Sequence, residues 1–204
     1  MSFSQIALIL AGYLSGAIPY GYLLTKKMTG LNILEQGSGN IGSTNVGRIA
    51  GKRIGLLVQV LDMLKGLIPV GIVILLLKSD PQIYPNYFPL VIALSTVIGH
   101  NFSIFLRLKG GKGVNTTLGA TILLAPIAVL SSVVVYFLVK WRIKYVSAGS
   151  MALAVALPIG GWLFSPDPML EYYLSVCCCL ILIRHISNLK RLIGGYELNQ
   201  NQNF

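Results

Sequence analysis

The placement of charge is the sequence feature that most limits the fold of this chain. Of its 16 Lys and Arg residues, all but Lys65 and Lys78 lie in or beside short segments that separate long apolar stretches. These basic segments are 26–53, 107–112, 140–144 and 184–191. Apolar stretches of about 20 residues predict helices that span a bilayer, and the basic loops between such helices stay on the cytoplasmic side. The pattern therefore predicts an integral membrane protein with its basic segments on one face.

Composition supports a single membrane domain, because 54% of the 204 residues are hydrophobic and only 11% are charged. We expect one polytopic domain over 1–198 and a flexible tail at 199–204, which is rich in Asn and Gln. A formal net charge of +10 is also found in nucleic-acid-binding proteins. Here the basic residues adjoin apolar stretches, so we expect membrane lipid as their partner and no nucleic acid.

Six apolar helices follow directly from the hydropathy pattern. They are expected at 4–25, 54–77, 87–106, within 114–139, at 146–164 and at 168–184, the last two being separated by Ser165-Pro166-Asp167-Pro168. Six crossings would place the basic segment 140–144 on the wrong side. Pro126 lies at the centre of 114–139 and favours a helix start there.

Two short helices, 114–124 and 126–141, would restore the charge pattern by entering the bilayer and returning. The predicted fold is therefore an all-α integral membrane protein with about seven transmembrane helices, two of them short. Its N-terminus is expected outside and its C-terminus in the cytoplasm. Five full spans with a re-entrant pair describe nearly the same object and remain an alternative.

The first polar segment is typical of an anion-binding loop. Its candidate substrate-binding residues are Gly37, Gly39, Asn40, Gly42, Thr44 and Asn45. Glycines let successive backbone N–H groups turn toward one anion, and Ser43, Thr44 or Asn45 can cap a following helix. Arg48 lies one turn from Thr44 and Asn45 and can face the same ligand. An ordinary flexible loop is the alternative.

The second polar segment combines two lysines with three glycines. It reads Lys109-Gly110-Gly111-Lys112-Gly113 and lacks the Ser or Thr that follows the lysine of a nucleotide-binding P-loop. We expect Lys112 and the backbone at Gly110, Gly111 and Gly113 to meet a phosphate, since lysine is a compact charge on a flexible stem. The alternative is that these lysines only set the topology.

The third polar segment follows the last apolar stretch. His185 and Asn188 are three residues apart and lie on one helical face, while Arg184, Asn188 and Arg191 form a second stripe. This arrangement is typical of a substrate clamp. A basic helix end whose side chains reach for the interface is the alternative.

Polar groups within the apolar stretches have structural interpretations. Asp62 and Lys65 are one turn apart, which favours a buried ion pair over a proton relay. His100 is expected mid-helix as a satisfied core histidine. The consecutive cysteines 177–179 are expected to be small buried hydrophobic residues. The sequence shows no carboxylate cluster for a metal and no nucleophilic motif, so we expect no metal, no cofactor and an already activated substrate.

These segments, in this order, resemble the bacterial acyl-phosphate:glycerol-3-phosphate acyltransferases, the PlsY family. The resemblance rests on Gly37-Ser38-Gly39-Asn40 through Arg48, Gly99-His100-Asn101 with Lys109 through Gly113, Arg184-His185 through Asn188, Arg191 and Glu197, and Asp62 with Lys65-Gly66. It covers nearly the whole chain.

The resemblance implies a membrane enzyme that catalyses the first acylation of phospholipid synthesis. A fatty acyl group would pass from acyl phosphate to glycerol-3-phosphate, giving lysophosphatidic acid and phosphate. The family's site residues fall on Ser38, Arg48, Lys112, Ser147, His185 and Asn188. The resemblance further implies the bacterial inner membrane, an active site facing the cytoplasm and a partner enzyme that makes acyl phosphate. A transporter of a phosphorylated metabolite is the alternative.

Overall fold

The computed structural model describes residues 1–81 and 84–198, and these ranges contain helices and loops but no strand. The α-helices are α1 (Phe3–Ala17), α2 (Tyr20–Thr29), α3 (Ser43–Ile49), α4 (Lys52–Ser79), α5 (Phe88–Asn101), α6 (Val114–Thr121), α7 (Pro126–Ile143), α8 (Val146–Phe164), α9 (Pro168–Arg184) and α10 (Ile186–Ile193). Two 3₁₀ helices lie at Ile33–Glu35 and Ile104–Leu106.

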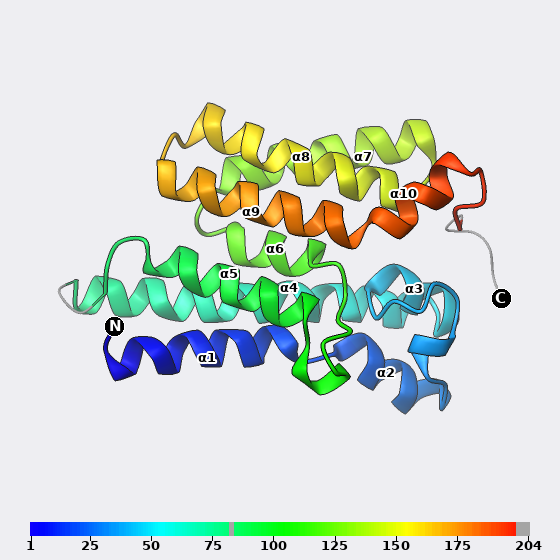
Figure 1. Ribbon diagram of the computed structural model, residues 1–204, viewed down its shortest axis with the longest axis horizontal. Coiled ribbons are helices and arrows are strands. Elements are labelled where there is room, and N and C mark those ends of the chain that lie inside the picture. Colours follow the sequence, from blue (N-terminus) through cyan, green and yellow to red (C-terminus); the bar gives the residue numbers. More distant parts are fainter. Residues whose placement is uncertain (82–83, 199–204) are drawn as a thin grey trace.

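The long helices run roughly alongside one another in two layers (Figure 1). One layer holds α1, α4 and α5, the other holds α7, α8 and α9, and α6 lies between them. The short helices α3 and α10 lie together at the end of the bundle opposite the N-terminus. The basic segments that the sequence places around α3 and α10 therefore share one end of the molecule.

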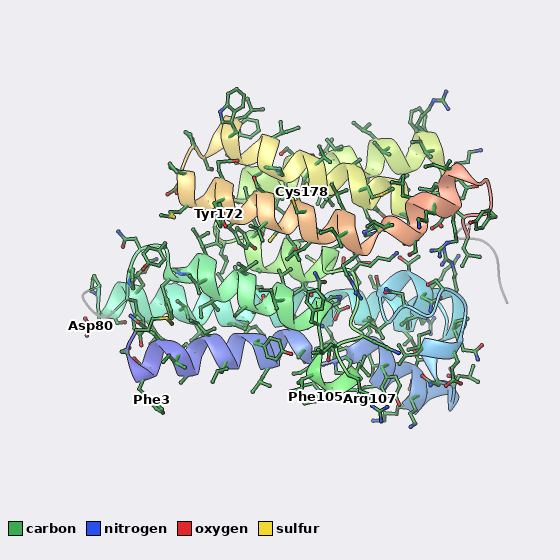
Figure 2. All side chains as sticks on the ribbon, in the orientation of Figure 1. Phe3, Asp80, Phe105, Arg107, Tyr172 and Cys178 are labelled. Carbon is green, nitrogen blue, oxygen red and sulfur yellow. The ribbon has the colours of Figure 1, made fainter. Side chains whose placement is uncertain are left out.

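The outer faces of the bundle are apolar, as a lipid-facing surface requires. Large hydrophobic side chains stay exposed along α1, α4, α7 and α8, including Leu10, Ile68, Val134 and Trp162. Phe3 and Phe105 project from the edge of the bundle in Figure 2. Within the described residues, five helical segments are long and apolar enough to cross a membrane, or six if α9 and α10, bent by 54°, form one span. The prediction of an all-helical, multi-pass membrane fold is confirmed at this level.

Some predicted helix bounds agree with the structure, and others differ. Helices α8 and α9 have the predicted bounds. Pro126 is the first residue of α7, a position where the backbone N–H has no partner within the helix, so a proline costs no hydrogen bond there. Of the two helices expected to be short, only α6 is short. Helix α7 continues for 18 residues until Lys144 adopts a left-handed conformation with φ of 67°.

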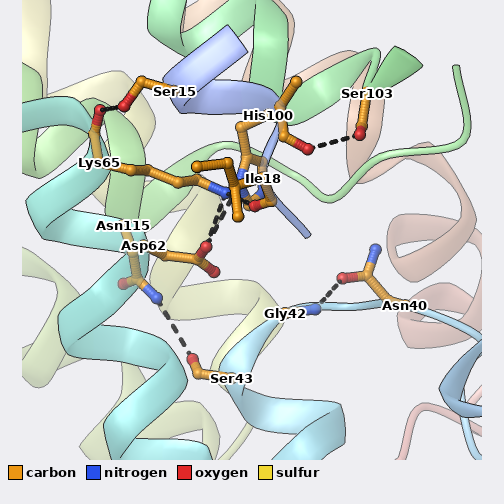
Figure 3. Close-up of polar contacts among 11 residues, drawn as sticks. Ser15, Ile18, Asn40, Gly42, Ser43, Asp62, Lys65, His100, Ser103 and Asn115 are labelled. Atoms are coloured by element: carbon orange, nitrogen blue, oxygen red, sulfur yellow. Dashed lines mark hydrogen bonds and ion pairs between the residues drawn. The ribbon is translucent and has the colours of Figure 1, made fainter. Parts of the chain in front are cut away.

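The first apolar stretch is interrupted by a break between α1 and α2 that the sequence analysis did not predict. Pro19 has no N–H group, so the helix cannot continue with its regular hydrogen bonds. The hydroxyl of Ser103 donates to the Ala17 carbonyl, and the Lys65 ammonium donates to the Ile18 carbonyl at 3.0 Å (Figure 3). Carbonyls freed by the break are thus satisfied by side chains from other helices.

The predicted ion pair between Asp62 and Lys65 is present. Lys65 Nζ lies 2.7 Å from Asp62 Oδ1, and both side chains are buried (Figure 3). His100 differs from the prediction, because it lies in the last turn of α5 and not in mid-helix. Its Nδ1 is 3.8 Å from Asp62 Oδ1 and has no hydrogen-bond partner within the described residues, so it is buried without being fully satisfied.

The cysteine prediction holds only for Cys177, which is buried. Cys178 is half-buried and Cys179 is exposed, because consecutive helical residues point in different directions and α9 buries only one face. The predicted tail at 199–204 lies outside the described residues.

We predict that the buried ion pair stabilises the bundle only as a pair. Lys65→Met leaves the Asp62 carboxylate unpaired and should lower the free energy of unfolding by about 3–5 kcal/mol, measured by denaturation in detergent. The double variant Asp62→Leu/Lys65→Met removes both charges and should lose less than Lys65→Met alone. Losses that simply add would contradict this account.

Candidate active site

A pocket of about 340 Å³ joins the three polar segments at the basic end of the bundle. The residues that line it are Ser38, Asn40, Lys112, Ile183, Arg184, Ser187, Asn188 and Arg191. Of these, Ser38, Asn40, Lys112 and Asn188 were predicted as site residues from the sequence. The fold therefore brings segments separated by more than 140 residues of chain to one cavity, as the motif analysis expected.

Asn45 holds the first segment in its folded shape. Its Oδ1 accepts a hydrogen bond from the Ser38 N–H at 3.0 Å, and its Nδ2 donates to the carbonyls of Gln36 and Asn40. Gly37 adopts φ of 56° and passes so close to Asn45 that a Cβ would lie 2.4 Å from the amide oxygen. Asn45 therefore shapes the loop that presents Ser38 and Asn40, and its amide is already occupied.

The predicted capping of α3 by a side chain is wrong. The N-cap is Gly42, which has no side chain, and its N–H donates to Asn40 Oδ1 at 2.8 Å (Figure 3). Asn45 is turned back toward the loop, and the Ser43 hydroxyl accepts a hydrogen bond from Asn115 of α6. Thr44 lies half-buried in the first turn of α3 and does not line the pocket.

The glycines of the second segment let its backbone pack tightly against the end of α5. The Gly111 N–H donates to the His100 carbonyl at 3.0 Å. Gly113 has φ of 82°, and a Cβ there would lie 2.7 Å from Asn101 Oδ1. Lys112 lines the pocket, whereas Lys109 is exposed at the other end of the segment. The structure thus separates the two lysines, and Lys112, the one expected to meet a phosphate, is the one at the pocket.

The third segment begins at a bend in the chain. His185 separates α9 from α10 and is buried, and its Nδ1 donates to the Ile181 carbonyl at 2.8 Å. The buried Asn188 accepts a hydrogen bond from the Lys112 ammonium through Oδ1 and donates through Nδ2 to Glu197 Oε1 at 2.6 Å. Arg191 Nε donates to the other oxygen of Glu197 at 2.8 Å.

The electrostatics of the pocket are dominated by cations. Burial lowers the pKa of Lys112 to about 8, and the charge of Glu197 opposes this shift. The nearby charges of Arg191, Arg48 and Arg184 also lower the pKa of Lys112, and the value of about 8 includes their effect.

Glu197 is the carboxylate within this group of cations. Burial by itself raises its pKa, but hydrogen bonds from Asn188 and Arg191 outweigh burial, so the net pKa lies below its ordinary value. Glu197 therefore stays ionised at neutral pH and offsets only part of the surrounding positive charge. The excess of positive charge makes the pocket suited to an anionic ligand.

Other predicted site residues surround the pocket without lining it. Arg48 is half-buried and donates to the Leu198 carbonyl at 2.9 Å, while its Nε has no partner among the described residues. Ser147 is buried at the start of α8. The predicted residues that do not line the pocket are Gly37, Gly39, Gly42, Thr44, Asn45, Arg48, Gly110, Gly111, Gly113, Ser147 and His185.

Sequence reasoning missed two lining residues and the contacts of a third. Ile183 and Ser187 line the pocket, and a one-turn spacing from Ser187 to the predicted stripe could have indicated its place. Arg184 was assigned to that stripe, but its contacts with the second segment require the fold. Within the described residues, no group of three or more His, Cys, Asp and Glu side chains could hold a metal ion.

The chemistry that this arrangement supports is recognition of phosphate groups. Ammonium and guanidinium groups form charge-assisted hydrogen bonds with phosphate oxygens, and these bonds strengthen in a partly dehydrated site. The pocket is lined in part by residues of α10, which lies at one end of the bundle, whereas transporters place their substrate site near the membrane midplane. The geometry thus favours a surface-facing site over a transport path.

Comparison with known proteins agrees with this geometry. The family model for glycerol-3-phosphate acyltransferase matches residues 6–195. A glycerol-3-phosphate acyltransferase of Clostridium acetobutylicum is 42% identical over 94% of this chain and 98% of its own. A second, from Syntrophotalea carbinolica, is 41% identical over 93% of this chain and 94% of its own.

Two solved structures have the same fold. They are crystal structures of PlsY, an integral membrane glycerol 3-phosphate acyltransferase, in a glycerol 3-phosphate form and a lysophosphatidic acid form. Their TM-scores are 0.87 and 0.84 at 33% and 32% identity, and each comparison covers 96% of this chain and 95% of the other. With its three motif segments joined at one cationic pocket, the chain belongs to the PlsY family of glycerol-3-phosphate acyltransferases, multi-pass membrane enzymes of phospholipid synthesis.

Proposed function

We propose that this enzyme transfers a fatty acyl group from acyl phosphate to the 1-hydroxyl of glycerol-3-phosphate. The products are 1-acyl-glycerol-3-phosphate, or lysophosphatidic acid, and inorganic phosphate. The observation that carries the proposal is the pocket in which Lys112 and Asn188 meet beside Arg184 and Arg191, with the charge of Arg48 acting on Lys112 from outside the lining. Both substrates bring a phosphate group, so the site has to balance several negative charges.

The reaction needs orientation and charge neutralisation more than a protein nucleophile. Acyl phosphate is a mixed anhydride with a good leaving group. The acceptor oxygen attacks the acyl carbon, a new C–O ester bond forms, and the bond between the acyl carbon and the phosphate oxygen breaks. The departing phosphate takes up the proton of the alcohol. Holding both substrates in one pocket converts a bimolecular reaction into an effectively unimolecular one.

The predicted site residues have four roles in this scheme. Lys112, with Arg48 beside it, neutralises charge on the substrate phosphates, while Ser38 and Asn188 supply neutral hydrogen bonds. His185 and Ser147 complete the site from the side of α8 and α9. The remaining predicted residues shape the loops: Gly37, Gly39, Asn40, Gly42, Thr44, Asn45, Gly110, Gly111 and Gly113.

We place the enzyme in the bacterial inner membrane with this pocket facing the cytoplasm. The positive-inside rule supports this orientation, because the four basic segments 26–53, 107–112, 140–144 and 184–191 carry 14 of the 16 Lys and Arg residues. This orientation puts the N-terminus outside and the C-terminus inside. Helix α6 enters the bilayer and α7 returns, so that seven transmembrane helices are counted, two of them forming this pair. A partner enzyme at the cytoplasmic face would supply the acyl phosphate.

We predict that the purified enzyme uses acyl phosphate and not acyl-CoA. Incubation with acyl phosphate and glycerol-3-phosphate should release phosphate and form lysophosphatidic acid in equal amounts. Acyl phosphate alone should leave no acyl label on the protein, because transfer is direct. Comparable turnover with acyl-CoA, or a trapped acyl-protein, would contradict the proposal.

The two lysines of the second segment should differ in their effect on catalysis. Lys112→Ala removes a charge-assisted contact with phosphate, so kcat/KM should fall about ten- to hundredfold, whereas Lys109→Ala at the exposed position should have a milder effect. Both variants should insert and purify like the parent protein. Equal and small losses of kcat/KM in the two variants would show that both lysines only set the membrane topology.

The proposed topology predicts where a membrane-impermeant thiol reagent reacts. In a background with cysteines 177–179 replaced by Ala, which should stay active, new cysteines at Ser43 and Lys144 should react only from the cytoplasmic side. A cysteine at Asn86 should react only from outside. Labelling of Lys144→Cys from outside would show that α6 and α7 do not form an entering and returning pair.

A further inference from the structure

We propose that Arg184 is a positioning residue: it holds the backbone of the 109–113 segment and thereby keeps Lys112 in the pocket. This inference rests on the proposed role of Lys112 as a phosphate ligand.

Arg184 is the last residue of α9, and its side chain contacts the 109–113 segment. Its Nε donates to the Gly111 carbonyl at 2.9 Å, and its terminal NH2 group donates to the Gly110 carbonyl at 2.6 Å. Its guanidinium also lies over the ring of Phe102, 5.7 Å from the ring centroid. One side chain thus holds two consecutive peptide groups immediately before Lys112.

The opposite side of the same backbone is held by α5. The Gly111 N–H donates to the His100 carbonyl, and a Cβ at Gly111 would lie 2.2 Å from His100 Nε2. A Cβ at Gly110 would lie 2.0 Å from the His100 carbonyl oxygen. The segment is therefore clamped between α5 and Arg184. The backbone position of Lys112, the next residue, is fixed as a result.

The chemistry of the contact requires a guanidinium. Arginine presents parallel donors in a rigid plane that match two neighbouring carbonyl oxygens, whereas a lysine offers one compact charge on a flexible stem. Arg184→Lys keeps the positive charge in the pocket but loses the fork. The substitution consequently separates positioning of Lys112 from direct attraction of substrate, which is the competing explanation because Arg184 also lines the pocket.

A double-mutant cycle between Arg184 and Lys112 tests the proposal. Arg184→Lys alone should lower kcat/KM about tenfold or more, through loss of two charge-assisted hydrogen bonds. In the Lys112→Ala background the same substitution should change the residual kcat/KM less than about threefold, because the group that it positions is already gone. Additive losses would show that Arg184 acts on its own and would overturn the proposal.

The pH profile gives a second readout that a purely structural residue would not move. If Lys112 has to be protonated, kcat/KM should decline as pH rises through about 8, because burial lowers the pKa of Lys112 to about that value. Loosening the segment in Arg184→Lys lets water reach Lys112, so the decline should shift to higher pH. A decline at the parental pH would contradict the proposal.

Lys190→Gln serves as the matched control, since Lys190 is an exposed cation on α10 and does not line the pocket. It should leave kcat/KM and the pH profile unchanged.

If Lys112→Ala itself retains full activity, the proposed phosphate site fails. If Lys112→Ala is impaired but the losses add, only the role of Arg184 fails. Should neither Arg184→Lys nor Arg184→Gln fold in detergent, Arg184 is a folding determinant and the proposal is likewise overturned.

Discussion

The hydrogen bond between Lys112 and Asn188 is the contact on which the site depends. Lys112 belongs to the segment that links α5 to α6, and Asn188 belongs to α10, so the bond joins the second polar segment to the third at the basic end of the bundle. Asn188 is in turn held by Glu197, whose second oxygen accepts from Arg191. A partly buried ammonium is unfavourable unless its donors are satisfied. This chain of contacts supplies an acceptor while leaving the surrounding charge positive.

The apolar environment explains why so many contacts between helices in the interior are hydrogen bonds, ion pairs and close approaches at glycines. Helix α6 has only eight residues and is buried along its length from Thr116 to Thr121. Gly119 packs against the Met63 carbonyl, and Gly66 packs against the Thr116 carbonyl, so α4 and α6 approach closely. In a bilayer, where hydrophobic burial does not drive helices together, such small-residue contacts provide the packing. They also place the start of α6, and with it Lys112, at a fixed depth.

Much of this architecture could be predicted from hydropathy and charge, for reasons that are local in sequence. The break between α8 and α9 follows from Ser165-Pro166-Asp167-Pro168, and the start of α7 follows from Pro126. The Asp62–Lys65 pair could be predicted because both residues lie on one helix at a one-turn spacing.

Features that depend on contacts distant in sequence could not be predicted. The break at Pro19 is stabilised by Ser103 and Lys65, and the contacts of Arg184 fall on Gly110 and Gly111, some 73 residues earlier. The same limit applies to Asn45, whose amide was expected to meet substrate and instead holds its own loop. Spacing along a chain places residues on a face, but it does not show which partners have already taken their hydrogen bonds.

Protection of Lys112 from an amine-reactive reagent tests the central claim most directly, with Lys109 in the same molecule as an internal reference. At pH 8, near the pKa of Lys112, acetylation of each lysine can be followed by mass spectrometry with and without glycerol-3-phosphate. If the pocket binds the substrate phosphate, glycerol-3-phosphate should slow modification of Lys112 several-fold and leave Lys109 unchanged. Equal modification rates of Lys112 with and without glycerol-3-phosphate would contradict the account.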